Sequence, residues 1–277
     1  ITTVLNNRDY ATQRLNDRFR KFIKAIKPSW LLAIKGETLL PETLEFARKE
    51  GIKTVNWFPD SFRVKEHILK VVNDYDFFIH YDSLVCEYLQ KRRFRNVSYL
   101  PYAADLLPSD PDPVYGSSRI YPVSFIGNFF PSREKLFRRV TSAEVFIWGN
   151  EPWKKSSLSG RYQGVCPFGG VNDILSKTKV SINLHYAKRS NGANLRVFET
   201  ARAGACLLTD RKKDVENLYT RGEEIITYES PTEFESKAKY LLGNSNLTQK
   251  VGMRAFLRTK NEHTYVHRIR AILNTIR

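Results

Sequence analysis

The stretch that decides the fold is Asn194-Leu-Arg-Val-Phe-Glu-Thr-Ala-Arg-Ala-Gly-Ala-Cys-Leu-Leu-Thr-Asp210. Its first half predicts a helix that begins near Asn194, and Gly204 then turns the chain into the apolar run Cys206–Thr209. A helix that leads through a glycine turn into a short apolar strand is the repeating element of a parallel α/β sheet.

Outward from this stretch, short apolar runs alternate with helical patterns in both directions. The runs that predict strands are Trp30–Ile34, Thr54–Phe58, Phe77–His80, Val97–Leu100, Val123–Ile126, Val145–Trp148, Val180–Leu184 and Ile225–Tyr228. Residues 9–26 predict an amphipathic helix, and helical patterns near 232–242, 247–258 and 264–276 close the chain. The alternation predicts βαβ units and parallel sheets.

The alternation stops between Pro101 and Tyr121, where proline, aspartate and serine replace the apolar period. Such a segment is typical of an interdomain linker. We therefore expect two Rossmann-like domains, residues 1–115 and 116–277. The last helix is expected to cross back to the first domain.

Composition narrows the functional classes. The chain has 277 residues, 42% of them hydrophobic, and a formal net charge of +16. This content supports a folded core, and no apolar run reaches the length of a membrane span. The three cysteines, Cys86, Cys166 and Cys206, have neither disulfide-framework nor zinc-site spacing, which favours a reducing compartment.

Polar residues follow the apolar runs, at the positions where parallel strands carry ligand-binding loops. They are Lys35-Gly36-Glu37, Pro59-Asp60-Ser61, His80, Gly127-Asn128, Gly149-Asn150, His185 and Asp210. Two sheets that face each other across a cleft would bring these groups together. Because most βα loops are polar, each residue taken singly also has a plain structural explanation.

The helix that starts near Asn194 has the strongest chemical character. Its free amides and positive dipole end suit a diphosphate. Glu199 lies about one and a half turns further along, where its carboxylate would accept two hydrogen bonds from a ribose diol. The small residues Ala201, Ala203 and Gly204 allow a close approach. The alternative is an ordinary solvated glutamate.

Four blocks of the sequence, in this order, resemble the GT-B glycosyltransferases and, within them, the CgeB-like (spore-maturation-like) group. The blocks are Val123-Ser-Phe-Ile-Gly-Asn128 with Ser132-Arg133, Asn194 to Asp210, Glu223-Glu-Ile-Ile-Thr-Tyr228, and His263-Thr-Tyr-Val-His-Arg268. The resemblance covers most of residues 95–277 and, more weakly, the strand near 54–60. It implies a glycosyltransferase that holds a nucleotide-sugar donor mainly in the second domain and an acceptor mainly in the first.

The donor residues expected under this resemblance are Gly127, Asn128, Arg133, Asn194, Leu195, Arg196 and Glu199. Two features depart from the family pattern. Many retaining members carry a glutamate eight residues before the ribose-binding one, where this chain has Asn191. The first domain also lacks a recognisable first strand and glycine-rich loop ahead of residues 9–26, so we expect it to be incomplete.

Sugar transfer needs positive charge at the diphosphate, because the leaving phosphate gains negative charge in the transition state. Arg133 and Arg196 are the candidates, although Arg133 also fits a merely basic surface. An inverting reaction needs a base for the acceptor hydroxyl, for which Asp60 is the first candidate and Glu37 the second. A retaining reaction would instead use a group such as His185 beside the sugar or phosphate. Turn and strand-end roles are the alternatives for Asp60 and His185, and the stereochemistry stays open.

Partners follow from the same pattern. No DxD-like metal motif follows a strand, so we expect metal-independent transfer with the nucleotide sugar as donor substrate and no other cofactor. The charge suggests an acceptor that is an anionic glycan, protein or lipid. The expected location is the cytoplasm, with or without peripheral contact at the inner membrane surface.

Two other functional classes compete with this interpretation. The basic run Lys91-Arg-Arg-Phe-Arg95 and a sequence pI near 9.7 fit a nucleic-acid-binding protein. No recognised nucleic-acid motif accompanies them, and the basic residues are dispersed. A GT-B protein that binds a sugar nucleotide or glycan without turnover is the other alternative, which Asn191 favours.

Overall fold

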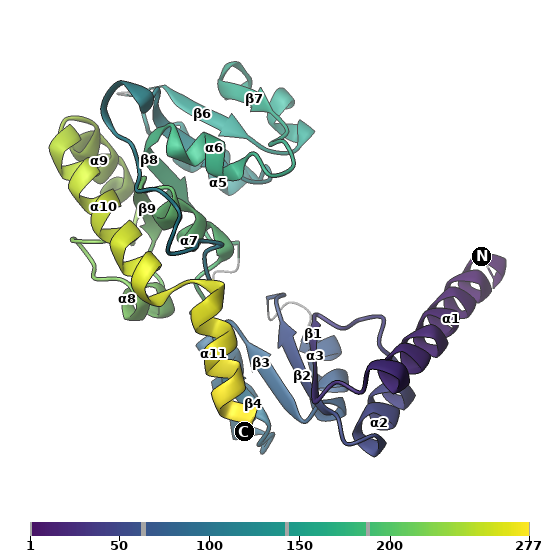
Figure 1. Ribbon diagram of the computed structural model, residues 1–277. Coiled ribbons are helices and arrows are strands. Elements are labelled where there is room, and N and C mark those ends of the chain that lie inside the picture. Colours follow the sequence, from purple (N-terminus) through teal and green to yellow (C-terminus); the bar gives the residue numbers. More distant parts are fainter. Residues whose placement is uncertain (1, 62–64, 142–143, 187–188, 277) are drawn as a thin grey trace. The chain divides into compact units, whose positions relative to one another are not determined.

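A computed structural model of the chain describes residues 2–61, 65–141, 144–186 and 189–276. The chain forms two compact units (Figure 1). The first contains Ile1–Pro101, Arg189–Gly192 and Leu273–Arg277, and the second contains Tyr102–Lys188 and Ala193–Ile272. Each unit holds one parallel sheet, which confirms the expected class of two Rossmann-like domains.

The first unit is a four-stranded parallel sheet with helices between its strands. Its elements are α1 (Thr2–Ile26), β1 (Trp30–Ile34), α2 (Pro41–Lys49), β2 (Lys53–Phe58), α3 (Lys65–Val71), β3 (Phe77–His80), α4 (Ser83–Lys91) and β4 (Val97–Tyr99). The strands follow the chain order β1-β2-β3-β4. Phe58 and Phe78 pack with Leu89 in its core, because aromatic and branched side chains fill a sheet buried on both faces.

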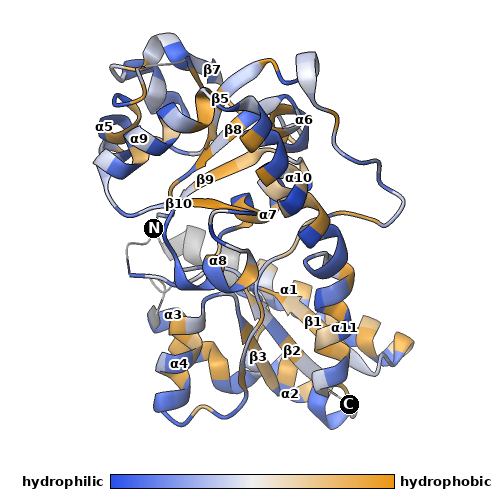
Figure 2. Cartoon of the chain, turned by 90° about the vertical axis from the view of Figure 1, so that its left-hand side faces the viewer, coloured by the Kyte–Doolittle hydropathy of each residue, from blue (hydrophilic) through white to orange (hydrophobic). Residues whose placement is uncertain are grey.

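The second unit is a six-stranded parallel sheet. Its strands are β5 (Tyr121–Ile126), β6 (Val145–Trp148), β7 (Tyr162–Gly164), β8 (Thr178–Asn183), β9 (Cys206–Asp210) and β10 (Ile226–Tyr228). Its helices are α5 (Pro131–Phe137), α6 (Val171–Ser176), α7 (Leu195–Arg202), α8 (Lys213–Leu218), α9 (Pro231–Leu242), α10 (Ser245–Glu262) and α11 (Tyr265–Ile276). Hydrophobic residues concentrate on the strands, whereas most helices show both hydrophobic and hydrophilic residues (Figure 2).

The order of the second sheet is β10-β9-β8-β5-β6-β7. The chain therefore builds outward from β5 through β6 to β7, and then returns to the other side of β5 with β8. This reversal makes a topological switch point between β5 and β8, the place where open α/β sheets bind ligands at the carboxyl ends of their strands.

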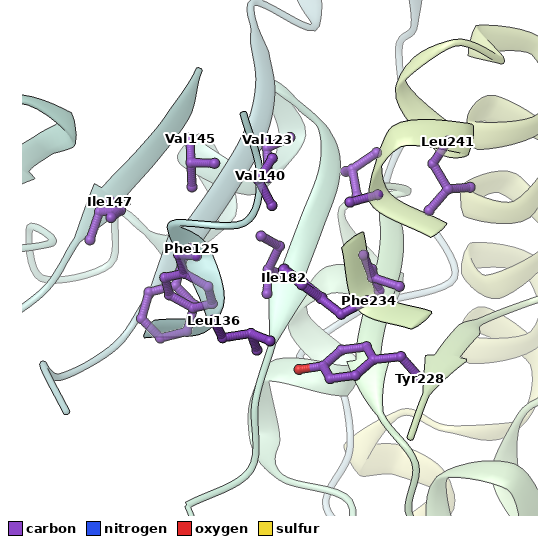
Figure 3. Close-up of a cluster of buried hydrophobic side chains, with 14 of the residues drawn as sticks. Val123, Phe125, Leu136, Val140, Val145, Ile147, Ile182, Tyr228, Phe234 and Leu241 are labelled. Atoms are coloured by element: carbon purple, nitrogen blue, oxygen red, sulfur yellow. The ribbon is translucent and has the colours of Figure 1, made fainter. Parts of the chain in front are cut away.

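The core of the second unit fixes the position of the switch point. Val123 and Phe125 of β5 pack against Ile147 of β6 and Ile182 of β8, and Phe234 of α9 covers them (Figure 3). These side chains come from strands on both sides of the switch point. The two carboxyl ends are thus held by a packed core.

Two parts of the second unit differ from the sequence-based expectation. Tyr162–Gly164 forms the edge strand β7, which the sequence did not predict because its three residues show no apolar run. The segment after Pro101 is also packed, since Ala104 and Leu106 are buried. The Ala104 amide donates to the His263 carbonyl at 2.8 Å. The division between the units accordingly falls at Pro101, whereas the expected boundary followed residue 115.

Two segments return to the first unit from later in the chain. Arg189–Gly192 lies between β8 and α7 in the sequence but belongs to the first unit. The end of α11, from Leu273, also belongs there. Within the described ranges, no helix combines the length and apolarity needed to cross a membrane.

Candidate functional site

Arg133 of α5 links the carboxyl ends of β5 and β8 at the switch point through hydrogen bonds. Its Nη1 donates a hydrogen bond to the carbonyl oxygen of Asn128, which follows β5, at 2.6 Å. Its Nη2 donates to the carbonyl of Leu184, which follows β8, at 2.9 Å. The guanidinium also lies 4.9 Å from the centre of the Phe130 ring. Arg133 is 9% exposed, so its charge is fixed in place at this edge.

The charge of Arg133 is not balanced by a direct ion pair. Burial lowers the pKa of Arg133 to about 10, although the negative charge of Asp210 partly opposes this shift. The guanidinium therefore stays protonated at neutral pH. Among the described residues, no carboxylate lies within 4 Å of it. A buried cation without an adjacent carboxylate is a fitting place for an anionic ligand.

Gly127 is required by close packing beside Arg133. A Cβ atom at this position would lie 2.8 Å from the Phe125 ring and 3.3 Å from Nη1 of Arg133. The Gly127 carbonyl accepts a hydrogen bond from Nε1 of Trp153 at 2.9 Å. The loop after β5 is consequently packed closely against Phe125, Arg133 and Trp153.

His185, directly after Leu184, joins three segments of the second unit. Its Nε2 accepts a hydrogen bond from the Asn194 amide at 3.2 Å. That contact requires a lone pair on Nε2, so the proton lies on Nδ1, which donates to Oδ1 of Asp210 at 2.7 Å. Both ring nitrogens are therefore engaged within the protein. The ring sets the position of the α7 start against the ends of β8 and β9.

Asp210 stays ionised in this network. Burial by itself would raise the pKa of Asp210, but the hydrogen bonds from His185 and the charge of Lys212 outweigh burial and lower it. The same Oδ1 also accepts the His185 backbone N–H at 2.8 Å. This carboxylate accepts the hydrogen bond from the His185 ring. Its negative charge is also the one that partly opposes the lowering of the Arg133 pKa.

The helix α7 begins as the sequence predicts. Asn194 is its N-cap, but its side chain makes no capping bond. Instead the side-chain amides of Asn194 and Asn183 each donate one hydrogen bond to the other, at 3.0 and 3.1 Å. The Asn194 side chain thus leaves the first turn of the helix uncapped, and Leu195 in that turn is exposed.

Arg196 and Glu199 form an ion pair on α7. Nη1 of Arg196 lies 2.8 Å from Oε2 of Glu199. Burial lowers the pKa of Arg196, while the charge of Glu199 opposes that shift. Charge interactions also relate Glu199 to Cys166 and Tyr265. The carboxylate proposed for a ribose is therefore held by the adjacent arginine.

A separate polar cluster lies at the carboxyl ends of the first sheet. Nζ of Lys35 lies 2.9 Å from Oδ2 of Asp60 and 3.1 Å from Oε1 of Glu37. Hydrogen bonds to Asp60 and Glu37 raise the pKa of Lys35. Nε2 of the buried His80 lies 3.0 Å from the Asp60 carbonyl oxygen. The cluster positions Asp60 with its carboxylate paired and about 40% exposed.

The segment Arg189–Gly192 is fixed in the first unit by Asp82, the N-cap of α4. Ser190 Oγ donates to Oδ2 of Asp82 at 2.6 Å, and the Asn191 amide donates to Oδ1 at 3.1 Å. The Asn191 side chain donates to Ser83 Oγ at 3.1 Å. A Cβ at Gly192 would clash with the ring of Tyr81 at 2.7 Å. Asn191 is thus a structural anchor of this segment.

Family comparison assigns the chain. The family described as "Glycosyl transferase-like" matches residues 133–274, more than half of the sequence. The chain belongs to this glycosyl transferase-like family. The match begins at Arg133 and includes α7 with Arg196 and Glu199. No match was found among curated protein sequences.

Solved structures similar to this glycosyl transferase-like chain share its fold at low identity. Anabaena HepE, solved with UDP, has a TM-score of 0.66 at 10% identity, over 95% of this chain and 82% of HepE. S. aureus TarM, solved with UDP and alpha-GlcNAc-glycerol, has a TM-score of 0.65 at 11% identity, over 92% of this chain. Pneumococcal O-GlcNAc transferase GtfA, solved with UDP and GlcNAc, has a TM-score of 0.60 at 12% identity, over 93% of this chain. This chain spans 57% of TarM and 59% of GtfA.

In this glycosyl transferase-like chain the expected residues fall into three groups. Gly127, Asn128, Arg133, His185 and Asn194 meet around the switch point, with Leu195 following at the start of α7. Arg196 and Glu199 form the pair on α7. Asp60 belongs to the first unit. Within the described part of the chain, no three histidine, cysteine, aspartate or glutamate side chains gather as metal ligands do.

Sequence reasoning missed three contributors to these groups. The Leu184 carbonyl and Asn183 act through the end of β8, and Asp82 anchors a segment more than a hundred residues away in the chain. Only Asp82 carried a signal, since it comes two residues after the predicted strand Phe77–His80, where ligand-binding loops begin.

Pockets of about 350 and 440 Å³ open elsewhere on the second unit. The smaller is lined by Arg119 and Lys179, which lie at the amino ends of β5 and β8. Arg119 donates hydrogen bonds to the carbonyls of Leu175, Thr178 and Ala203. The donors of Arg119 are thus already bonded to backbone carbonyls and are not free for a ligand in this pocket. We therefore assign the candidate functional site to the carboxyl ends of the strands.

Proposed function

We propose that the protein transfers a sugar from a nucleoside-diphosphate sugar to an acceptor, with a uridine nucleotide as donor. The observation that carries the proposal is Arg133, a buried cation without an adjacent carboxylate at the switch point of a parallel sheet. HepE, TarM and GtfA, which share the fold, were solved with UDP, and this supports uridine as the base.

The proposed donor site combines the loop after β5 with the start of α7. Gly127 and Asn128 bring backbone close to the diphosphate, and Arg133 balances its charge. Asn194, Leu195 and Arg196 offer the first helical turn. Glu199 accepts hydrogen bonds from the ribose diol. His185 acts by positioning, since its ring nitrogens hold the Asn194 amide and Asp210.

The proposed chemistry is displacement of the nucleoside diphosphate by an acceptor hydroxyl. Negative charge grows on the leaving diphosphate, and the fixed charge of Arg133 stabilises it more in the transition state than in the ground state. The acceptor oxygen bonds to the anomeric carbon on the face opposite the departing diphosphate, so the configuration is inverted. Asp60 takes the proton of the acceptor hydroxyl. This route is favoured because Asn191 cannot ionise and its side chain is bonded to Ser83.

The sequence blocks also support a more specific proposal for the group, the sugar and the acceptor. We propose a hexosyl-type transfer within the CgeB-like group, without a bound metal ion, to an anionic glycan, protein or lipid acceptor in the cytoplasm or at the inner membrane surface. The block from Asn194 to Asp210 supports the group assignment, and the charge of +16 supports an anionic acceptor. Nucleic acid is not the expected partner.

Isothermal titration with UDP, GDP, ADP and TDP tests the donor site. We expect UDP to bind and to raise the melting temperature. Absence of binding by all four nucleotides at millimolar concentration would refute the proposal.

Slow hydrolysis of UDP-sugars, followed by release of UDP, tests turnover without knowledge of the acceptor. Binding without hydrolysis favours the second candidate, a non-catalytic sugar-nucleotide-binding protein, for which Asn191 is the supporting observation. The assay is repeated in EDTA and in magnesium. Equal rates are expected, and a rate that requires magnesium would contradict metal independence.

A further inference from the structure

A column of aromatic rings beside Arg133 begins in the core of the second unit and ends at its surface. Phe125 of β5 is buried, and the Arg133 guanidinium lies 5.1 Å from the centre of its ring. The same guanidinium lies 4.9 Å from the centre of the half-buried Phe130 ring. Phe130 in turn packs against Tyr186, with ring centroids 4.6 Å apart. Tyr186 is 51% exposed, so the column ends in an aromatic ring that solvent reaches.

Backbone hydrogen bonds hold the middle of this column in place. The Phe129 amide donates to Oδ1 of Asn150 at 2.6 Å. The next residue, Phe130, is the N-cap of α5, and its carbonyl accepts the Arg133 amide at 2.9 Å. The Phe130 ring therefore has a defined place, and Tyr186 packs against a fixed partner.

The column and the start of α7 belong to opposite faces of the second sheet. In β9, Cys206 and Leu208 belong to the core that also contains Phe137 of α5. Leu207, which lies between them in the chain, belongs to the core that contains Phe198 of α7. Neighbouring residues of a strand point to opposite faces, so α5 and α7 cover different faces. A ligand that reaches both must cross the carboxyl edge of the sheet.

We infer that the transferred sugar of the donor stacks on the ring of Tyr186, and that the Phe130–Tyr186 pair forms the sugar subsite. The inference rests on the proposed function, in which Glu199 of α7 holds the ribose and Arg133 the diphosphate. The ribose and the transferred sugar are attached to opposite ends of the diphosphate. A donor whose ribose lies on the α7 face therefore carries its sugar towards the α5 face, where Tyr186 packs against Phe130.

The chemistry of the exposed ring suits a hexose. The face of an aromatic ring carries partial negative charge. The C–H groups on one face of a hexose carry partial positive charge, so the two faces attract each other and exclude water between them. Stacking of the nucleobase on Tyr186 is the alternative, but it would place the nucleoside on the α5 face, away from Glu199.

Isothermal titration of the full chain with UDP, UDP-glucose, UDP-galactose and UDP-N-acetylglucosamine tests the inference. For the UDP-sugar that binds most tightly, Tyr186→Ala should weaken binding about fivefold, the loss expected when an aromatic contact is removed. The affinity for UDP should stay unchanged. Tyr186→Phe keeps the ring and should bind as the unchanged chain does, whereas Tyr186→Leu keeps only apolar bulk and should lose affinity.

Tyr240→Ala is the matched control. Tyr240 is also an exposed tyrosine of the second unit, at 61%. It lies in the last turn of α9, a helix that starts after the carboxyl end of β10 and ends at Leu242. This variant should bind UDP and the UDP-sugars as the unchanged chain does.

Three results would overturn the inference while UDP binding persists. The first is unchanged UDP-sugar affinity in Tyr186→Ala. The second is an equal loss for UDP and the UDP-sugar, which would place the nucleoside on the ring. The third is full affinity in Tyr186→Leu, which would show that the ring is not needed. Absence of UDP binding by the unchanged chain is a different failure, because it refutes the proposed donor site itself and the sugar subsite with it.

Discussion

The carboxyl ends of the two sheets use charge in opposite ways. In the first sheet, Lys35 lies between Glu37 and Asp60, and all three side chains are well exposed. In the second sheet, Arg133 is buried and bonded to two backbone carbonyls. The first edge therefore pairs its cation directly with two carboxylates. The second edge holds a cation that has no carboxylate within 4 Å among the described residues.

This difference suggests that the first edge serves proton transfer and the second edge serves binding of the diphosphate. A carboxylate that is about 40% exposed, as that of Asp60 is, is accessible to a hydroxyl whose proton it would accept as a base. A guanidinium fixed by carbonyls suits an anion, because no reorganisation is needed when the charge arrives. Substitutions at the first edge should affect turnover, and those at the second should affect nucleotide binding.

The largest expected effect is on turnover at the first edge. If Asp60 is the base, Asp60→Asn should slow UDP-sugar hydrolysis by about two to four orders of magnitude, the range for general base catalysis. UDP affinity should stay unchanged, since Asp60 belongs to the first unit. Asp105→Asn, at an aspartate outside the strand-end clusters, is the control. An unchanged rate would leave Asp60 as the ion-pair partner of Lys35 alone.

The second prediction concerns the cation of the second edge. Arg133→Met removes the charge and leaves the carbonyls of Asn128 and Leu184 without a donor. It should lower UDP affinity and reduce the free energy of unfolding by about 3 kcal/mol. Titration and urea denaturation measure the two effects. Arg138→Gln, at an exposed arginine just after α5, should change neither.

Arg133→Lys separates charge from geometry at this position. Lysine keeps the positive charge but cannot bond both carbonyls in the planar fork of arginine. UDP affinity that survives in Arg133→Lys and fails in Arg133→Met would identify charge as the essential property. Full affinity in both variants would contradict the assignment of the diphosphate to this edge.

A smaller effect is expected from Glu199. Glu199→Gln should weaken UDP affinity by about 1.5 to 3 kcal/mol, the range for hydrogen bonds to a charged group, with little change in folding. Glu223→Gln is a matched control, because Glu223 pairs with Arg254 at 3.1 Å on an exposed surface. Unchanged affinity in a folded Glu199→Gln variant would assign this carboxylate to Arg196 only.

The start of α7 shows what sequence alone predicts well. Helical spacing, a glycine turn and an apolar run are local signals, and α7 with β9 forms where they indicate. Arg133 was also a sequence candidate, but its contacts were not predictable. Leu184 lies 51 residues away from it in the chain, and the contact exists only because β8 pairs with β5.

Non-local contacts explain the other gaps. The hydrogen-bonding state of His185 depends on Asp210 and on the Asn194 amide, which come from different elements. The edge strand β7 gains its shape from pairing with β6, since its own three residues carry no strand signal. Family spacing singled out Asn191 only as a departure from the usual glutamate. Its bond to Ser83 depends on the return of that segment to the first unit.

The smallest predicted effect is a pH dependence of the free energy of unfolding that arises from His80, the last residue of β3. Burial lowers the pKa of His80 to about 4, although the charge of Asp82 and backbone hydrogen bonds partly oppose the shift. The Asp82 amide donates to Nδ1 at 3.0 Å, so Nδ1 must stay unprotonated and Nε2 donates to the Asp60 carbonyl. In the folded protein His80 is therefore neutral above about pH 4.

The sign of the pH dependence follows from this neutral state. In the unfolded chain His80 takes up a proton below about pH 6.5, whereas in the folded chain it does so only near pH 4. Acid therefore favours unfolding: the contribution is fully present above pH 6.5 and is lost as the pH falls towards 4. Between pH 7 and 5 the loss should be about 2 kcal/mol.

Urea denaturation of the unchanged chain and of His80→Gln at pH 7 and pH 5 measures this contribution. Glutamine cannot take up the proton, so the variant should be less stable at pH 7 but should lose about 2 kcal/mol less on acidification. Val55→Ala, which removes buried volume from β2 without a titratable group, should lower stability equally at both pH values. A parallel fall of His80→Gln and the unchanged chain would mean that His80 is protonated in the folded state. The first edge would then carry an additional cation behind Asp60, and its contrast with the second edge would be weaker than the contacts indicate.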